Sequence, residues 1–212
     1  MRRLPVYLLL DTSGSMMGEP IEAVKNGVQT MVSALRQDPY ALETAFLSII
    51  TFNSSASQPV PLTELTSFQT PSIDASGTTS LGAALSLLAQ RAEVEVNKTT
   101  AEQKGDWKPI VFIMTDGMPT DDWQKGLSDF QKQRWGMVVA CAAGQAVDTT
   151  ILKQITEVVV KLDTADSSSF KAFFKWVSAS ISTSSAKIEE GGKEIGGLNE
   201  LPPPPPEVNV VV

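Results

Sequence analysis

The sequence predicts an α/β protein: a doubly wound, mostly parallel six-stranded sheet with one antiparallel edge strand and helices on both faces. Two observations favour this fold. Short apolar segments alternate along the chain with segments in which apolar residues recur at helical spacing, as expected when strands alternate with helices. The strand segments are apolar throughout, which is typical of strands buried on both faces of a parallel sheet.

The first predicted strand covers Val6 to Leu10 and stops at Asp11, where the chain becomes small and polar. The spacing Asp11-x-Ser13-x-Ser15 places one carboxylate and two hydroxyls on a tight loop at the carboxyl end of this strand. In open α/β sheets this is the end where ligands bind. Because the oxygens are hard and mostly neutral, they suit Mg²⁺ or Ca²⁺ rather than a thiophilic metal.

A helix begins at Glu19-Pro20, since proline is favoured at the first helical position, and ends at Asp38-Pro39. Residues 45–52 form the second predicted strand. After a turn, residues 58–62 form a short strand that contains two prolines, so it belongs at an edge of the sheet. The hairpin connection makes this edge strand antiparallel to its neighbour.

The rest of the chain continues the alternation, because apolar strands are again followed by amphipathic segments. The last helix has a stripe of aromatic and aliphatic residues that is expected to face the core. The predicted elements are helices over 81–94, 124–135, 149–155 and 167–181, and strands over 110–114, 137–142 and 158–162.

Two later loops complete a pattern with the first. Ser76 to Leu85, SGTTSLGAAL, places a Gly-Thr-Thr loop before a helix, and Val111 to Gly117, VFIMTDG, ends a strand in Thr-Asp-Gly. With Asp11-x-Ser13-x-Ser15, these pieces resemble the metal-ion-dependent adhesion site of von Willebrand factor A domains. The resemblance covers roughly residues 4–182 and implies a Rossmann-like fold of that family.

The resemblance assigns five residues to a divalent cation, with Mg²⁺ favoured and Mn²⁺ or Ca²⁺ as alternatives: Asp11, Ser13, Ser15, Thr79 and Asp116. The register of residues 82–85 against the family favours Thr79 over Thr78. In the family the serines bind the ion directly, as the threonine does in some states, while a carboxylate often acts through water. Two carboxylates leave the ion electrophilic, so an acidic oxygen of a protein partner is expected to complete its coordination.

The whole chain, including its proline-rich end, also resembles the TerY-type proteins of bacterial tellurium-resistance clusters. This resemblance implies a docking module that serves a serine/threonine-type kinase and a metal-dependent phosphatase in tellurite or stress resistance. With a kinase nearby, phosphorylation of loop hydroxyls would add negative charge beside the cation. We hypothesise that it switches partner binding off at residues expected to be exposed: Ser13, Ser15, Thr78 and Thr79.

Two other functions stay open. A metal-dependent phosphoester hydrolase would also use Asp and Mg²⁺, but the chain has no histidine, no second acidic cluster and no P-loop glycine pattern. We therefore expect that the protein is not an enzyme and that it has no catalytic residue. The second alternative is an assembly element that acts through the proline-rich tail alone.

Several polar and aromatic residues near these loops have a structural interpretation as well. Asp11 and Ser13 could form a helix cap and a polar turn instead of a metal site. Asp121 and Asp122 are expected to cap the helix that follows them. Trp123 and Met118 are candidates for the rim of the docking face, and Trp123 could instead pack at the sheet edge.

Composition limits the compartment and the partners. The net charge of −7 argues against a general nucleic-acid partner, and the absence of histidine removes His-dependent triads and His-ligated zinc. The single Cys141, expected to be a buried inert thiol, favours a reducing compartment. The apolar run after Arg3 breaks at Asp11 without a signal-peptide cleavage site, and no apolar stretch is long enough to span a membrane. We expect a cytoplasmic bacterial protein without a membrane partner.

Residues 183–212 are predicted to form a flexible Gly/Pro-rich tail after a domain of residues 1–182, because their composition cannot bury enough apolar surface. Pro202 to Pro206 are expected to form a stiff polyproline rod, either a spacer or a ligand for an aromatic groove. The apolar end, Val208 to Val212, is expected to dock on the domain or on a partner.

Overall fold

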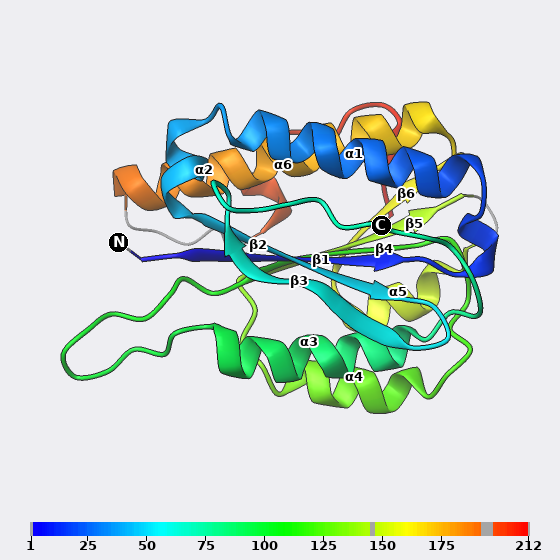
Figure 1. The fold of residues 1–212 in the computed structure, drawn as a ribbon, viewed down its shortest axis with the longest axis horizontal. Helices are drawn as coiled ribbons and strands as arrows, with labels where there is room; N and C mark the ends of the chain where they lie inside the picture. Colours follow the sequence, from blue (N-terminus) through cyan, green and yellow to red (C-terminus); the bar gives the residue numbers. More distant parts are fainter. Residues whose placement is uncertain (1, 145–146, 192–196, 212) are drawn as a thin grey trace.

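In the computed structural model, which describes residues 2–144, 147–191 and 197–211, a seven-stranded sheet lies between two layers of helices (Figure 1). The strands lie in the order β3 (Ala56–Glu64), β2 (Ala45–Phe52), β1 (Leu4–Asp11), β4 (Ile110–Thr115), β5 (Met137–Ala143), β6 (Val158–Leu162) and β7 (Val208–Val210). One face is covered by α1 (Glu19–Leu35), α2 (Pro39–Thr44) and α6 (Ser167–Gly191), and the other by α3 (Leu81–Glu95), α4 (Trp123–Gln131) and α5 (Thr149–Ile155). The predicted fold class is confirmed.

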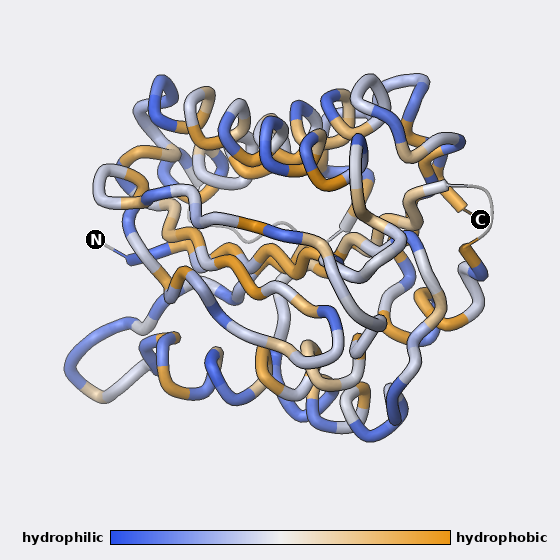
Figure 2. The backbone as a smooth tube through the Cα atoms, turned by 45° about the vertical axis from the view of Figure 1, so that its right-hand side comes forward, coloured by the Kyte–Doolittle hydropathy of each residue, from blue (hydrophilic) through white to orange (hydrophobic). Residues whose placement is uncertain are grey.

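β1 lies at the centre of the sheet and pairs in parallel with β2 on one side and with β4 on the other. All of its residues are buried, which explains why its sequence is apolar without alternation. Successive side chains point to opposite faces, so Val6 and Leu8 join the core under α1 and α6, while Tyr7 and Leu9 join the core under α3. In Figure 2 the strands at the centre are mostly hydrophobic, while hydrophilic and hydrophobic residues alternate along the helices that cover them.

The edge strand was predicted in the correct place and direction, since β3 is antiparallel to β2. The short helix α2 was not predicted. Pro39 ends the preceding helical pattern, but Asp38 then caps a new helix, because its Oδ1 accepts a hydrogen bond from the Ala41 amide at 3.0 Å.

Among the described residues, no helix has the length and hydropathy needed to cross a membrane.

The last helix extends beyond its predicted end at Ile181. Ile188 continues the buried stripe, and the buried Ser184 hydroxyl is satisfied by the Ser180 carbonyl at 2.7 Å. α6 therefore continues to Gly191, and the predicted boundary after residue 182 lies inside this helix. Residues 192–196, which belong to the predicted flexible tail, and Val212 lie outside the described residues.

The end of the chain returns to the domain and adds the seventh strand, one more than predicted. Val208 and Val210 of β7 pair antiparallel with Leu162 and Val160 of β6. The apolar end was expected to dock either on the domain or on a partner, and Val208–Val210 dock on the domain. The proline segment is also held, since the Trp176 indole N–H donates to the Pro202 carbonyl at 2.8 Å.

A chain that ends at Gly191 should lose stability but keep its cation affinity. It loses the buried side chains of Leu201 and Val208, each worth about 1.5–3 kcal/mol. The ordering entropy of the segment offsets part of this. We expect the free energy of unfolding to fall by about 1–3 kcal/mol in urea titrations. An unchanged unfolding midpoint would contradict the packing of this segment.

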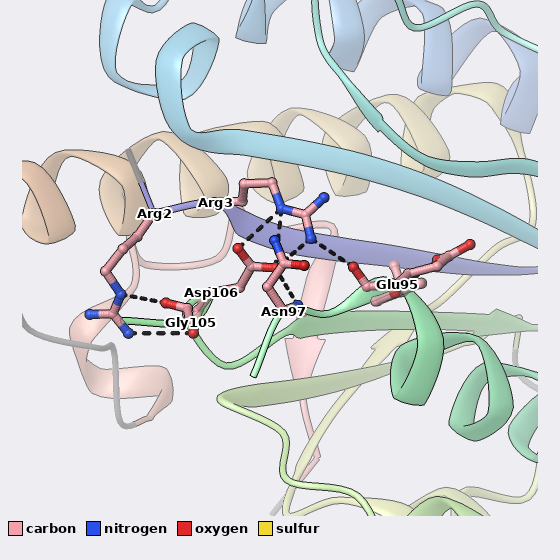
Figure 3. Close-up of polar contacts among 7 residues, drawn as sticks. Arg2, Arg3, Glu95, Asn97, Gly105 and Asp106 are labelled. Atoms are coloured by element: carbon pink, nitrogen blue, oxygen red, sulfur yellow. Dashed lines mark hydrogen bonds and ion pairs between the residues drawn. The ribbon is translucent and has the colours of Figure 1, made fainter. Parts of the chain in front are cut away.

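The end of the sheet opposite the β1 loop is closed by the segment 97–107, which is fastened to the start of β1 (Figure 3). The Arg3 guanidinium contacts the Asp106 carboxylate through Nη2 at 2.5 Å and Nε at 3.0 Å. The Arg2 Nε donates to the Gly105 carbonyl at 2.7 Å. These contacts cover the amino ends of the central strands. A ligand is therefore expected to bind the loops at the carboxyl ends, as is usual in open α/β sheets.

Candidate metal centre

Three loops meet at the carboxyl ends of β1 and β4. The first and third loops follow these two strands directly and are adjacent because the strands pair with each other. The second loop, residues 76–80, is tied to the first by the backbone: the Ser76 amide donates to the Thr12 carbonyl at 2.8 Å, and the Gly14 amide donates to the Gly77 carbonyl at 2.9 Å. Motifs that are far apart in the sequence are thereby brought to one place.

A chain of hydrogen bonds links four of the five predicted ligands. The Asp11 Oδ1 accepts from the Ser13 amide at 2.8 Å. The Ser13 and Ser15 hydroxyl oxygens are 3.1 Å apart. The Ser15 hydroxyl donates to the Asp116 Oδ1 at 2.7 Å, so the first and third loops are joined through side chains.

Thr79 lies beside this chain. A Cβ atom placed on Gly117 would be 3.5 Å from the Thr79 Oγ1, so this hydroxyl adjoins the Thr-Asp-Gly loop. Thr79 is buried. Thr78 is exposed instead, and both its amide and its hydroxyl bond to the Ser54 hydroxyl. Of the two threonines, Thr79 is thus the one whose hydroxyl lies beside the Thr-Asp-Gly loop.

The two carboxylates have raised pKa values. Burial is the main cause for both Asp11 and Asp116, and the charge of Asp11 also raises the pKa of Asp116. The hydrogen bonds that oppose these shifts come from hydroxyl and amide groups, chiefly those of Ser13, Ser15 and Thr115. Within the described residues neither carboxylate forms a salt bridge. Two partly desolvated acids therefore stand together without a basic partner.

The donors fit a hard divalent cation. They are carboxylate and hydroxyl oxygens, the ligands that Mg²⁺ and Ca²⁺ prefer. No group of three or more His, Cys, Asp or Glu side chains suited to a metal occurs among the described residues. Such a cation would therefore depend on the serine and threonine hydroxyls. Any residue set of this kind leaves coordination positions for water or a partner.

The expectation that all four loop hydroxyls are exposed is wrong for two of them. Ser13 is 1% exposed and Thr79 is 6% exposed, because the loops close over them. Ser15 and Thr78 are exposed as predicted. Only these two could meet a modifying enzyme without a rearrangement of the loops.

Sequence reasoning missed Thr115, whose hydroxyl donates to the Asp11 Oδ2 at 2.6 Å and orients that carboxylate. The signal was present, since Thr115 precedes Asp116 in the Thr-Asp-Gly motif, but the contact joins residues on different strands.

The two acids after this motif have different partners. Asp122 caps α4 as predicted, because its side chain accepts from the Lys125 amide. The prediction for Asp121 was wrong: it binds the first turn of α3, accepting from the Gly82 amide at 3.0 Å and from the Ala83 amide at 2.8 Å. The amphipathic pattern that follows Asp121 in the sequence could not reveal a partner on another helix.

The remaining side chains that were singled out are placed as follows. Met118, in the third loop, is 48% exposed. Trp123, at the start of α4, is half-buried. Cys141 is fully buried in β5, and burial raises the pKa of its thiol, as expected of an inert residue.

The family model of the von Willebrand factor type A domain matches residues 6–175, which include all three loops. The chain belongs to this family. The match agrees with the strand order, with the helices on both faces and with the three loops at the carboxyl end of the sheet. Von Willebrand factor type A domains are generally interaction modules rather than enzymes, and those with a metal-ion-dependent adhesion site bind divalent cations. A search of curated proteins gave no match.

Solved structures share the von Willebrand factor type A fold at low identity. Proximal thread matrix protein 1 from the mussel byssus, in a structure with a zinc-occupied MIDAS motif, is 18% identical with a TM-score of 0.60, over 84% of this chain and 48% of that one. A von Willebrand factor type A protein from Catenulispora acidiphila is 15% identical with a TM-score of 0.65, over 86% and 43%. The pilus adhesin SpaC from Lactobacillus rhamnosus GG is 15% identical with a TM-score of 0.66, over 86% and 30%. The chain thus spans less than half of these proteins and shares their fold.

Proposed function

We propose that this von Willebrand factor type A domain is a metal-dependent protein–protein docking module. Asp11, Ser13, Ser15, Thr79 and Asp116 hold the divalent cation, and a protein partner completes its coordination with an acidic side chain. Mg²⁺ is the favoured ion, with Mn²⁺ or Ca²⁺ as alternatives. The zinc in the byssus protein makes Zn²⁺ a further ion to be tested.

The observation that carries this proposal is the pair of carboxylates, Asp11 and Asp116, that have no basic partner in the part of the chain that the structure describes. Burial raises the pKa of both Asp11 and Asp116, so a nearby positive charge would stabilise their ionised forms. The hydroxyls of Ser13 and Ser15 lie between the two acids. A cation among these oxygens would relieve the repulsion between the carboxylates.

The charge of the ligands supports an acidic partner. Two carboxylates can at most neutralise a divalent ion, and one of them often binds through water in this family. A carboxylate from a partner would gain an ion–oxygen contact in a partly dry crevice, where electrostatic attraction exceeds that in water. Ser15 is exposed and Asp116 is half-buried. The partner would therefore approach the site from the side of these two residues.

The finer assignment rests on the resemblance of the whole sequence to TerY-type proteins. In this proposal the module works in the bacterial cytoplasm, in tellurite or stress resistance, with a serine/threonine-type kinase and a metal-dependent phosphatase as partners. Phosphate on Ser15, whose hydroxyl bonds to Asp116, or on Thr78, the neighbour of Thr79 in the chain, would add negative charge near the proposed cation. It would compete with the partner's acid and switch docking off.

The alternatives predict different behaviour. A phosphoester hydrolase would turn over generic phosphoesters with Mg²⁺ or Mn²⁺, although the chain has no histidine. An assembly element acting through its tail would lose its partner on truncation but not on chelation. Since α6 continues to Gly191, the truncation should begin after this residue rather than at residue 183.

The test is capture of native partners on the immobilised full chain in Mg²⁺, in chelator, and in Mg²⁺ restored after chelator. We expect a partner that is lost with chelator and recovered with Mg²⁺, because the cation bridges the two proteins. Substitution of one acidic residue of this partner by its amide should abolish capture. A partner that stays bound in chelator, or one lost only on truncation, would refute metal-dependent docking.

A further inference from the structure

The third loop also fixes the position of the second loop. Thr79 and Thr120 exchange two hydrogen bonds: the Thr79 amide donates to the Thr120 hydroxyl at 3.1 Å, and the Thr120 amide donates to the Thr79 carbonyl at 2.9 Å. The next residue, Asp121, accepts from the first turn of α3 with both carboxylate oxygens. Thr79 is thus held from one side by residues that follow the Thr-Asp-Gly motif.

The normal cap of α3 is missing. Ser80 occupies the N-cap position, but its side chain makes no capping hydrogen bond. The first amides of a helix need acceptors from outside the helix, and here Asp121 supplies them from a distant part of the chain. The start of α3 therefore depends on the third loop.

Tight packing keeps the two loops in register. A Cβ on Gly82 would lie 2.6 Å from the Asp122 carbonyl oxygen, and a Cβ on Gly126 would lie 2.2 Å from the Gly82 carbonyl oxygen. Only glycine permits this approach of α3 to the start of α4. A shift of the segment 120–122 must consequently move the first turn of α3, and with it Thr79.

From this arrangement, and on the basis of the proposed metal site, we propose that Asp121 and Thr120 are positioning residues for Thr79. Neither residue is itself a predicted ligand: Thr120 bonds to the Thr79 backbone, Asp121 bonds to the first turn of α3, and together they hold the Thr79 hydroxyl beside the loop that carries Asp116. Removal of their hydrogen bonds lets the second loop move and displaces the Thr79 hydroxyl. The affinity for the cation falls because this ligand is no longer held in position. Supporting residues of this kind typically contribute tenfold or more to metal affinity.

The experiment measures Mn²⁺ affinity by calorimetry in the full chain, with thermal melting as a check of folding. Asp121→Ala should raise the Kd about tenfold. Asp121→Asn, which keeps one acceptor oxygen, should have a smaller effect. The matched control is Asp122→Ala, which removes the same charge from the neighbouring residue and the cap of α4 but none of the hydrogen bonds to α3. Its Kd should stay within about twofold of the wild-type value, because exposed charges are screened.

A double-mutant cycle with Thr79→Ala separates positioning from charge. In the Thr79→Ala background, Asp121→Ala should add little, because both changes remove the same ligand. Should Asp121→Ala fail to fold, Thr120→Val removes an acceptor at an exposed residue without a change in charge, and its Kd should rise about threefold or more. Equal effects of Asp121→Ala and Asp122→Ala, additive effects in the cycle, or an unchanged Kd in Thr120→Val would overturn the positioning role alone. A wild-type chain that binds no Mn²⁺ would overturn the metal site itself.

Discussion

Asp11→Asn is expected to lower the affinity for Mg²⁺ or Mn²⁺ by about 100-fold or more, which is about 2.7 kcal/mol. Asp11 is 1% exposed, so its charge would act on a bound cation with little screening by water. The amide keeps the shape of the side chain. Its oxygen can still accept from the Ser13 amide, and its NH₂ group can donate to the Thr115 hydroxyl, which rotates to accept.

The same substitution should not destabilise the protein in the absence of metal. Burial raises the pKa of Asp11 in the folded protein, so near neutral pH its ionised form opposes folding, and neutral asparagine removes this penalty. Metal-free Asp11→Asn should therefore melt at or above the wild-type temperature. With Mg²⁺ the wild type should gain stability and the variant should not.

Thermal melting with and without Mg²⁺ and calorimetric titration distinguish the two effects. Asn53, at the turn between β2 and β3, offers a control as Asn53→Asp, which adds an acid near the second loop, since the Asn53 side chain bonds to Ser76 and Ser55 and to none of the predicted ligands. An Asp11→Asn variant with wild-type affinity would show that the three loops do not form a cation site. A variant that loses stability without metal would show that the carboxylate has a structural role.

Phe174→Ala is expected to reduce the free energy of unfolding by about 3–5 kcal/mol, the usual cost of removing a buried phenylalanine. Phe174 is 1% exposed and packs directly on the backbone of α1: a Cβ on Gly27 would lie 2.1 Å from its ring. The substitution opens a cavity between α1 and α6 that these helices cannot close without leaving the sheet.

Urea titration measures this loss, and Lys175→Ala provides the matched control on an exposed position of the same helix, with an expected change within about 0.5 kcal/mol. Cation affinity should be retained in Phe174→Ala below its melting temperature, since the three loops lie at the strand ends. A loss of less than about 1 kcal/mol would contradict the close packing of the two helices.

The first loop of the candidate site could be predicted from the sequence because its residues are close together in the chain. Asp11, Ser13 and Ser15 are neighbours on one turn, and the strand before them is apolar throughout, so both the loop and its place at the carboxyl end of a strand follow from a short segment. Thr79 and Asp116 were added by the resemblance of their two short motifs to those of the von Willebrand factor A family.

The burial of the same residues could not be predicted in this way. Ser13 and Thr79 are polar loop residues, and the sequence pattern suggests exposure. They are buried because the backbone of the first loop bonds to the second at Gly14 and Gly77. Accessibility of a hydroxyl depends on such contacts and not on the residue type.

Apart from α2 and β7, the sequence by itself determined the order and type of the helices and strands, and it contained the three motifs, because hydrophobic periodicity, proline and small polar turns act within a few residues. Only the tertiary structure decided that Asp121 caps α3 rather than the helix that follows it, that Thr115 orients Asp11, and that Val208–Val210 complete the sheet. Each of these is a hydrogen bond or pairing between segments far apart in the chain. Its partner is selected by the packing of the strands and helices, which short-range patterns do not encode.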